Sequence, residues 1–184
     1  MKRSVTAGLA LMLAVGTVPA FCFADERPEN RQEHRRFDNQ EGAFLRDRAQ
    51  DDVLMWRLGE YAANHAASVR VRELGRDISH NRQDDLREIQ RFSENHRVNV
   101  EQPKHLNANQ QRIYDDLTRK SGPDFDRGYT KVLAERYSDS VKQYQIMSDH
   151  AADPEVRDYA SHRLGQLKDH QRQAHDAERE VWGG

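Results

Sequence analysis

The chain has 184 residues, of which 33% are charged, and its formal net charge at pH 7 is −2. Acidic and basic residues are thoroughly mixed from residue 25 onward, which excludes the basic face that a nucleic-acid-binding protein needs. Because the sequence holds a single cysteine, no internal disulfide can form, and a stable domain must depend on packing.

The start of the chain predicts a secretory signal peptide over residues 1–24. Lys2 and Arg3 precede an apolar run over 5–21, and small residues follow at the spacing that signal peptidase prefers. The run is shorter than the roughly 20 residues of a membrane-spanning helix. Cys22 raises lipid attachment as an alternative, but the bulky residue before it disfavours a lipoprotein signal. We expect a periplasmic or secreted protein with no transmembrane segment after cleavage. Association with the outer membrane is the alternative localisation.

The next segment, 25–43, is almost entirely charged or polar. It cannot bury enough apolar surface to order itself, and we expect a flexible leader. Cleavage of the signal peptide would lower the Lys plus Arg count from 29 to 27, against 31 Asp plus Glu. The remaining segment, 44–182, is long enough for one domain.

The first two predicted helices follow from the spacing of apolar residues. From residue 44 onward these residues recur three and four positions apart, and the face from Leu54 to His65 marks the first helix. After a short break, a second helix is predicted over 71–92. Its inward face is apolar at both ends and polar in the middle.

The second half of the chain repeats this pattern after a crossover. Residues 98–110 predict a loop, and 111–117 predict a short helix within the crossover. A long helix begins at 121–124, where a proline suits the first turn and an aspartate favours the helix dipole. The last helix begins at 153–155 with an N-cap aspartate followed by proline, and it runs to about residue 177.

One phrase occurs twice at a spacing of 85 residues: Asn-His-Ala-Ala-Ser at 64–68 and Asp-His-Ala-Ala-Asp at 149–153. Each copy lies where one helical pattern ends and another begins, so each predicts the turn of a helical hairpin. A duplicated hairpin is the ground plan of ferritin-like bundles. We therefore expect an all-α, ferritin-like four-helix bundle made of two hairpins joined by a long crossover that contains a short helix.

Metal-binding motifs are degenerate. Ferritin-like enzymes use Glu-x-x-His pairs, and the chain has none. Asp77 and His80 have this spacing with a shorter acid, but His80 falls outside the inward face of its helix. Asp158 and His162 also lie beside the inward face, so we interpret both as surface pairs.

A polar belt is predicted at the middle of the core. Its members fall on the inward faces of their helices: Arg82, Asp85, Tyr137, Ser140 and His170. Buried charges must be paired or hydrogen-bonded. Arg82 can pair with Asp85 along one helix, and Tyr137 and His170 can complete a network across helices. We favour a layer that fixes helix register. The alternative is a small ligand or metal site, with His170 and Asp85 as metal ligands.

The two hairpin turns carry His65 and His150, which can each bond to carbonyl groups at a helix C-terminus. If the turns met at one end of the bundle, both histidines and Asp149 would form a second candidate metal site. The sequence has no Gly-x-Ser-x-Gly motif and no phosphate-binding glycine loop. We therefore assign no catalytic residue.

Four short motifs lie within the predicted domain: Leu58-Gly59, Ile113-Tyr114-Asp115-Asp116-Leu117, Phe125-Asp126-Arg127-Gly128-Tyr129 and Asp153-Pro154-Glu155-Val156. In combination they resemble the bacterial family catalogued as domain of unknown function 4142, over roughly residues 44–173. The resemblance implies an exported protein of ferritin-like fold. Members of the family are often labelled predicted outer-membrane proteins.

The resemblance also bears on metal binding. Similar members commonly carry inward histidines in the second, third and fourth helices, and acids before the Leu-Gly of the first. The matching positions here hold Arg82, Tyr137 and His170, with Met55 and Arg57 in place of the acids. Arginine cannot lose its proton to become a ligand, so of the histidines only His170 remains.

We draw three hypotheses on function. The first is a non-enzymatic protein of the envelope or of a stress response that acts through its surface, with no cofactor and with an envelope protein as a candidate partner. The second is a metal-binding or redox protein that holds a divalent metal with His170, Asp85 and Tyr137. The third is a periplasmic chaperone, because 106–110 (Leu-Asn-Ala-Asn-Gln) echoes the Leu-Thr-x-x-Gln motif of helical stress chaperones.

Overall fold

The computed structural model describes residues 28–95, 100–101 and 103–183, with side chains from residue 40 onward. Five helices and their connections account for these residues, none of which forms a strand, and the all-α prediction is confirmed. The helices are α1 (Pro28–His65), α2 (Val69–Asn95), α3 (Ala108–Thr118), α4 (Gly122–His150) and α5 (Pro154–Gly183). The signal peptide predicted over 1–24 lies outside the described residues.

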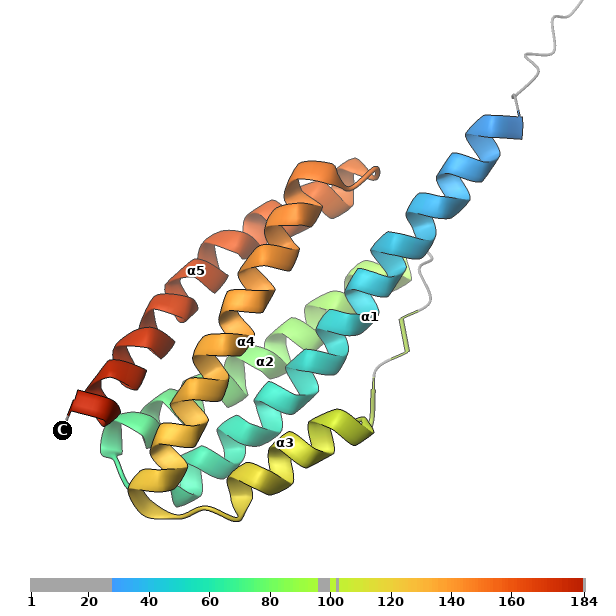
Figure 1. The fold of residues 1–184 in the computed structure, drawn as a ribbon. Helices are drawn as coiled ribbons and strands as arrows, with labels where there is room; N and C mark the ends of the chain where they lie inside the picture. The colour runs from blue at the N-terminus through green and yellow to red at the C-terminus, as the bar shows by residue number, and fades with distance from the viewer. Residues whose placement is uncertain (1–27, 96–99, 102, 184) are drawn as a thin grey trace, which may run out of the picture.

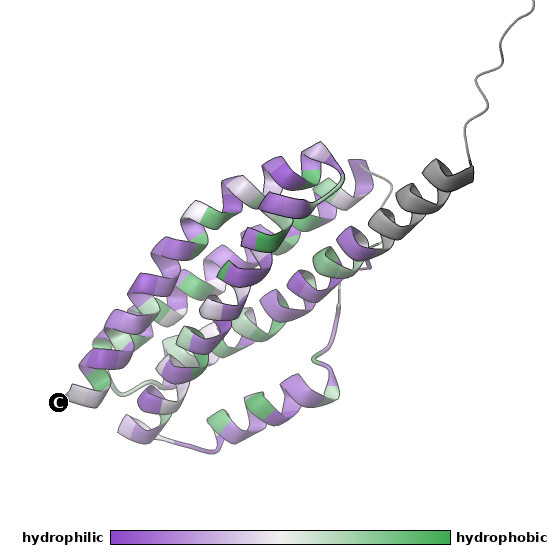
Figure 2. Ribbon diagram, turned by 45° about the horizontal axis from the view of Figure 1, so that its top comes forward, coloured by the Kyte–Doolittle hydropathy of each residue, from purple (hydrophilic) through white to green (hydrophobic). Residues whose placement is uncertain are grey.

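The four long helices form two hairpins, α1 with α2 and α4 with α5, that lie against each other (Figure 1). The crossover runs along the outside of α1 as α3, so that α4 begins beside the α1–α2 turn. Apolar residues form stripes on helices that are otherwise hydrophilic (Figure 2). Nowhere in the described part of the chain is a helix long and apolar enough to span a membrane.

Within the first hairpin, glycine allows a close approach of the two helices. A Cβ atom on Gly59 of α1 would lie 2.8 Å from the carbonyl oxygen of Gly75 and 2.9 Å from the amide nitrogen of Ser79, both on α2. Backbone atoms cannot rotate out of the way, so any side chain here would force the helices apart. The Leu-Gly motif noted in the sequence thus has a packing reason.

The two hairpins meet through large side chains rather than small ones. Phe44 of α1 packs edge-on against Tyr144 of α4, with ring centroids 4.9 Å apart. Phe92 of α2 packs against Tyr159 of α5 at 5.0 Å. Long polar side chains join the hairpins about one to two helical turns further along the bundle.

Each hairpin also holds the turn of the other through a buried carboxylate. Asp126 of α4 accepts hydrogen bonds from the amides of Ala67 and Ser68 in the α1–α2 turn, at 3.0 and 2.7 Å. Glu41 of α1 accepts one from the amide of Asp153 in the α4–α5 turn, at 3.0 Å. Glu41 and Asp126 are themselves 85 residues apart, so the internal repeat extends to the groups that hold the turns.

A second repeated contact closes each turn from within its own hairpin. Arg72 Nη1 donates to the carbonyl oxygens of Ala66 and Ala67 at 2.7 and 2.8 Å. Arg157, its counterpart 85 residues later, donates in the same way to the carbonyl groups of 151–152 at 2.8 and 3.5 Å. In both copies of the repeated segment, the turn therefore has backbone amide and carbonyl groups that are hydrogen-bonded to side chains.

The leader differs from the sequence prediction. Helix α1 begins at Pro28, so most of the segment predicted as a flexible leader over 25–43 is helical, and the domain begins before residue 44. Apolar periodicity misses this region because its anchor is polar: Glu41 is buried at 5% exposure and bonds to the α4–α5 turn.

The crossover helix begins earlier than predicted, at Ala108, within the segment assigned to a loop. Its start is fixed by a capping box. Asn107 Oδ1 accepts from the amide of Gln110 at 2.9 Å, and Gln110 Oε1 accepts from the amide of Asn107 at 3.2 Å. Several asparagines suggested a loop, although one of them is the helix cap.

Replacement of Gly59 by alanine tests the close approach within the first hairpin. We expect Gly59→Ala to lower the free energy of unfolding by about 1–3 kcal/mol, because the new Cβ meets backbone atoms of α2. Gly165→Ala on α5 is the matched control. Nothing lies within 4 Å of its added Cβ, so helix propensity should raise stability by about 0.5–1 kcal/mol. Urea unfolding measures both, and equal effects would contradict the packing argument.

Candidate functional site

A buried ionic network lies in the middle of the bundle, at the level of the predicted belt. Arg82 of α2 places Nη1 2.9 Å from Asp52 of α1 and 3.0 Å from Asp85 of α2. Arg163 of α5 contacts the other oxygen of Asp85 and lies 3.2 Å from Glu88. These five residues, which we call the ionic network, join α1, α2 and α5. The predicted pairing of Arg82 with Asp85 is confirmed.

A second group of polar contacts joins α1 to α4. Asp51 lies 3.3 Å from Arg136 of α4 and 4.0 Å from Arg48 of α1. Arg48 in turn donates to the hydroxyl of Ser140 at 3.0 Å. Together with the ionic network, these contacts bring charged or polar groups from all four long helices to one level.

His170 of α5 lies at the edge of the ionic network. Its Nδ1 is 3.4 Å from Nη2 of Arg82, and its Nε2 is 3.4 Å from the side-chain amide of Asn81. Because arginine can only donate, Nδ1 accepts and carries no proton. Burial and the positive charges of Arg82 and Arg163 lower the pKa of His170 to about 4. The imidazole is therefore neutral near pH 7.

Tyr137 of α4 presents the face of its ring to Arg82 and lies beside His170. The Arg82 guanidinium carbon lies 5.4 Å from the ring centroid, a cation–π contact, and the His170 ring lies 5.6 Å away. The hydroxyl has no hydrogen-bond partner among the described residues, and burial raises its pKa. The predicted link across helices therefore exists, but through the aromatic face.

Burial acts on the carboxylates and on the arginines in opposite ways. It raises the pKa of Asp51 and of Asp52 in spite of the arginines beside them. The pKa of Arg82 stays above its usual value, because Tyr137 and Asp52 outweigh the effect of burial. Burial and the charge of Arg82 lower the pKa of Arg163 to about 10. Both arginines are therefore charged at neutral pH.

Four of the five belt residues are buried and His170 is half-buried at the edge of the ionic network, but the belt was incomplete. It omitted Asp51 and Asp52, which lie one turn before the apolar face of α1 and are 8% and 5% exposed. It also omitted Arg163, although this residue lies on the inward face of the last helix. A polar residue at an apolar position of the helical repeat was the signal that could have identified all three.

The histidines of the two turns do not come together. His65 lies at the α1–α2 turn, where its Nδ1 bonds to the Tyr61 carbonyl oxygen at 2.9 Å. This turn lies beside the start of α4, whereas His150 ends that 29-residue helix (Figure 1). The paired metal site predicted from His65, His150 and Asp149 is therefore wrong. The antiparallel relation of the hairpins places the duplicated turns at opposite ends.

The other histidine and acid pairs lie on the surface, as predicted. The His80 side chain is 75% exposed, and its Nε2 is 3.5 Å from Asp84 rather than from Asp77. Asp158 and His162 are both exposed. Among the described residues, neither pair forms a hydrogen bond or ion pair with a second helix.

The residues of the ionic network do not fit a metal ion. Arg82 lies between Asp52, Asp85 and His170, where a cation would have to bind, and its guanidinium is permanently charged. Across the described residues, no three His, Cys, Asp or Glu side chains form a group that could hold a metal. The arrangement instead neutralises buried charge with arginine.

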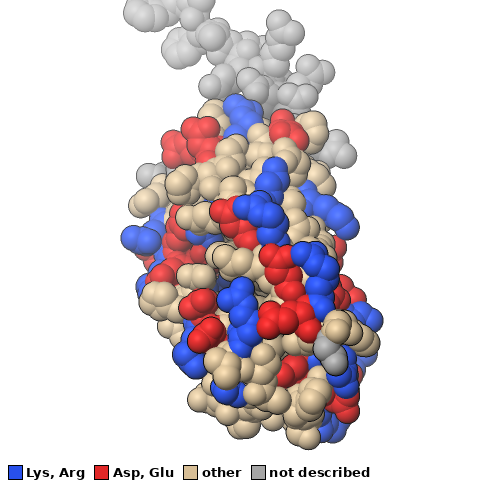
Figure 3. Space-filling view, turned by 90° about the vertical axis from the view of Figure 1, so that its left-hand side faces the viewer, with Lys and Arg blue, Asp and Glu red and all other residues tan. Residues whose placement is uncertain are grey.

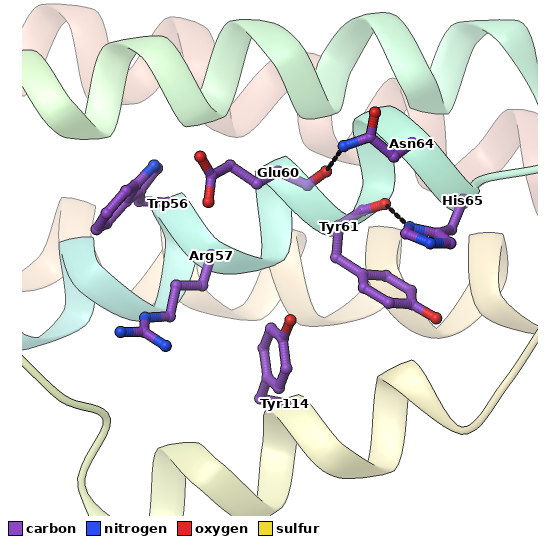
Figure 4. Close-up of a pocket in the computed structure, with 7 residues that line it drawn as sticks. All are labelled: Trp56, Arg57, Glu60, Tyr61, Asn64, His65 and Tyr114. Carbon is purple, nitrogen blue, oxygen red and sulfur yellow. Dashed lines mark hydrogen bonds between the residues drawn. The ribbon is translucent and has the colours of Figure 1, made fainter.

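An open groove of about 400 Å³ lies between α1 and α3. Figure 4 shows Tyr114 reaching from α3 toward α1, and the Tyr61 ring stacks on His65 with centroids 4.0 Å apart. Within the groove, Asn64 bonds to the backbone of Glu60 on its own helix at 2.8 Å. No lining residue belongs to the ionic network, and the side chains do not converge on a common point. The groove is the seam where the crossover helix packs.

Replacement of His170 by glutamine tests the neutral state of this side chain. The pKa of His170 is about 4 in the folded chain, against 6.5 for an unperturbed histidine. The unfolded chain therefore takes up a proton where the folded chain does not. Stability from neutral His170 is present above pH 6.5 and is lost as the pH falls toward 4. We expect the wild type to lose more free energy of unfolding over this range than His170→Gln.

The control for this experiment is His162→Gln, a change of an exposed histidine on the same helix. It should keep the wild-type pH dependence. Asp51 and Asp52 act in the opposite direction, because their raised pKa favours the folded state as the pH falls. They are present in every variant, so their contribution cancels in the difference. Equal pH dependence of wild type and His170→Gln would contradict the assignment.

Comparison with known proteins identifies a family without a described function. The family model for the domain of unknown function DUF4142 matches residues 26–177. No curated protein and no solved structure matches the chain. The match covers the first hairpin, the crossover, the polar belt and all but the last turns of α5, and it confirms the resemblance seen in the sequence motifs. The chain belongs to the DUF4142 family.

Proposed function

We propose that the protein is an exported, ferritin-like helical bundle that is not an enzyme and acts in the cell envelope through its surface. The observation that carries this proposal is the ionic network. Arg82 and Arg163 neutralise the buried carboxylates that a ferritin-like metalloprotein would turn toward metal ions. Export rests on the signal peptide predicted from the sequence.

The ionic network has a structural role in this proposal. A buried charge that loses its partner is costly, whereas a complete pair is close to neutral in free energy compared with apolar residues. A network of this kind therefore adds little stability but penalises every misaligned arrangement of the helices. Because Arg163 and Asp85 lie on opposite hairpins, we infer that it fixes the register of one hairpin against the other.

The surface is consistent with a protein that stays soluble until it meets a particular partner. Acidic and basic side chains are interspersed over the face shown in Figure 3, and no large region of one sign stands out there. Such a surface disfavours non-specific binding to polyanions. Recognition would therefore depend on a local feature of the surface rather than on net charge.

The chaperone hypothesis loses its main support. The segment 106–110 that echoes a chaperone motif contains Asn107 and Gln110, the two residues of the capping box of α3. Gln110 also bonds to the backbone of Gln50 at 2.8 Å and is buried. A local structural role thus explains this pattern without a chaperone function.

The structural role of Arg82 predicts a specific pattern of stability changes. Arg82→Leu leaves Asp52 without its partner and should lower the free energy of unfolding by about 3–5 kcal/mol. The double variant Arg82→Leu/Asp52→Asn removes both charges and should recover part of this loss, since Asp85 keeps Arg163. The control Arg87→Leu breaks an exposed pair with Asp84 and should cost less than about 1 kcal/mol. If the loss of stability in the double variant equalled the sum of the losses in Arg82→Leu and Asp52→Asn, the coupling between the two residues would be contradicted.

Metal content tests the proposal directly against its metal-binding alternative. Protein purified from the periplasm should contain iron and manganese far below one ion per chain, because Arg82 repels a cation at the belt. Elemental analysis by mass spectrometry measures this. Stoichiometric metal that is lost in His170→Ala would overturn the proposal in favour of the alternative that uses His170 and Asp85. A surface control, His162→Ala, identifies metal bound elsewhere.

A further inference from the structure

One end of the bundle combines exposed apolar side chains with cations. This basal end, at the bottom of Figure 1, is formed by the α1–α2 turn, the start of α4 and the last turn of α5. Val69 at the start of α2 is 59% exposed, and Trp182 near the end of α5 is 60% exposed. The remaining large exposed apolar side chain of the described residues, Ile146, lies toward the opposite end of α4.

Trp182 forms one wall of a shallow hollow of about 380 Å³. The other walls come from the α3–α4 junction and the first turns of α4, including Lys120, Arg127 and Lys131. The guanidinium carbon of Arg127 lies 5.8 Å from the Trp182 ring. A Cβ on Gly128 would lie 3.2 Å from the Lys120 ammonium nitrogen, so the absence of a side chain there lets Lys120 lie across α4.

The lining of the hollow holds more positive than negative charge, with Lys120, Arg127 and Lys131 beside the one carboxylate of Asp124. Among the described residues, Arg70 and Lys120 form no ion pair with an acidic side chain, and the exposed acids Glu73 and Glu180 of this end are likewise in no ion pair. Arg127 is paired with Asp124 at 2.6 Å and Lys131 with Glu135 at 4.0 Å. Exposed pairs of this kind contribute little and rearrange easily when another anion approaches.

We propose that the basal end docks on a membrane surface that contains anionic phospholipids. Trp182 and Val69 enter the headgroup region, while Lys120 and Arg70 approach the lipid phosphates. Tryptophan suits this depth because it joins a large apolar ring to a polar N–H group, and long cationic side chains reach phosphates while their stems stay in apolar surroundings. The inference rests on the proposed function, since it names the surface and the partner class of an envelope protein.

The fold holds the parts of this surface together. Asp126 and Arg127 are neighbours on α4: the first bonds to the α1–α2 turn, which leads into Val69, and the second contacts Trp182. The helices that carry Val69 and Trp182 are thus tied to one segment of α4. A few cations and one tryptophan give reversible binding rather than stable anchoring.

Sedimentation with lipid vesicles tests the proposal. The purified protein should sediment with phosphatidylglycerol-containing vesicles at low salt and much less with pure phosphatidylcholine vesicles. Lys120→Ala should weaken binding about five-fold, the effect of one cation near an anionic surface, and Trp182→Ser should weaken it further. In a Trp56→Phe background Trp182 is the sole tryptophan, so its fluorescence emission should shift to shorter wavelength on binding.

Matched changes on the same helix provide the control. Lys142 and Ile146 also place an exposed cation and an exposed apolar side chain one turn apart on α4, toward the other end. Lys142→Ala and Ile146→Ser should leave vesicle binding unchanged. The proposal is overturned if anionic vesicles bind no protein, or if the control changes weaken binding as much as the basal ones.

Two further outcomes separate this inference from related ideas. If inorganic phosphate quenches Trp182 while vesicles do not bind, the hollow takes a soluble anion and the membrane proposal fails. If the protein carries stoichiometric metal and still binds anionic vesicles through Trp182 and Lys120, the non-metal proposal fails while the docking surface stands.

Discussion

The structure depends on one buried guanidinium group. Arg82 is 4% exposed and lies among carboxylates from its own helix and from α1, with the Tyr137 ring and His170 beside it. A charge at that depth is tolerated only with its counterions, so the helices that supply them must lie in one relative position. The neutral state of His170 follows from the same cause, because a second positive charge beside Arg82 is unfavourable. The relative position of the helices, the neutral state of His170 and the poor fit of the ionic network to a metal ion therefore all follow from Arg82.

Two kinds of contact hold the bundle together. Inside the first hairpin, Gly59 and Gly75 permit helices to touch through their backbones, so the hairpin is defined by shape. Between hairpins, rings and ion pairs make the contacts, so the interface is defined by specific partners. Shape alone would allow the hairpins to slide along each other. The charged layer removes that freedom, since a shift of one helical turn would separate Arg163 from Asp85.

The sequence predicted most of what depends on periodicity and little of what depends on contacts between distant residues. Helical spacing and the repeated phrase identified both hairpins, the crossover helix and the five belt residues. The buried position of Glu41 could not be predicted, because its partner is a backbone amide 112 residues away. For the same reason the sequence did not show that His65 and His150 are separated by the length of α4, since that depends on how the hairpins are oriented. The burial of Asp51 and Asp52 could have been predicted, because both residues occupy inward positions of the helical repeat.

The carboxylates that hold the turns bear on how such a chain can arise. Glu41 acts on the second hairpin and Asp126 on the first, and the two positions are equivalent in the repeat. Reciprocal contacts between equivalent positions are the signature of a two-fold interface between identical subunits. The two halves of this chain thus meet as two copies of one hairpin would meet in a symmetric dimer. The crossover joins them covalently, which frees each half to diverge: position 85 is an aspartate within the ionic network, and its counterpart is the neutral His170.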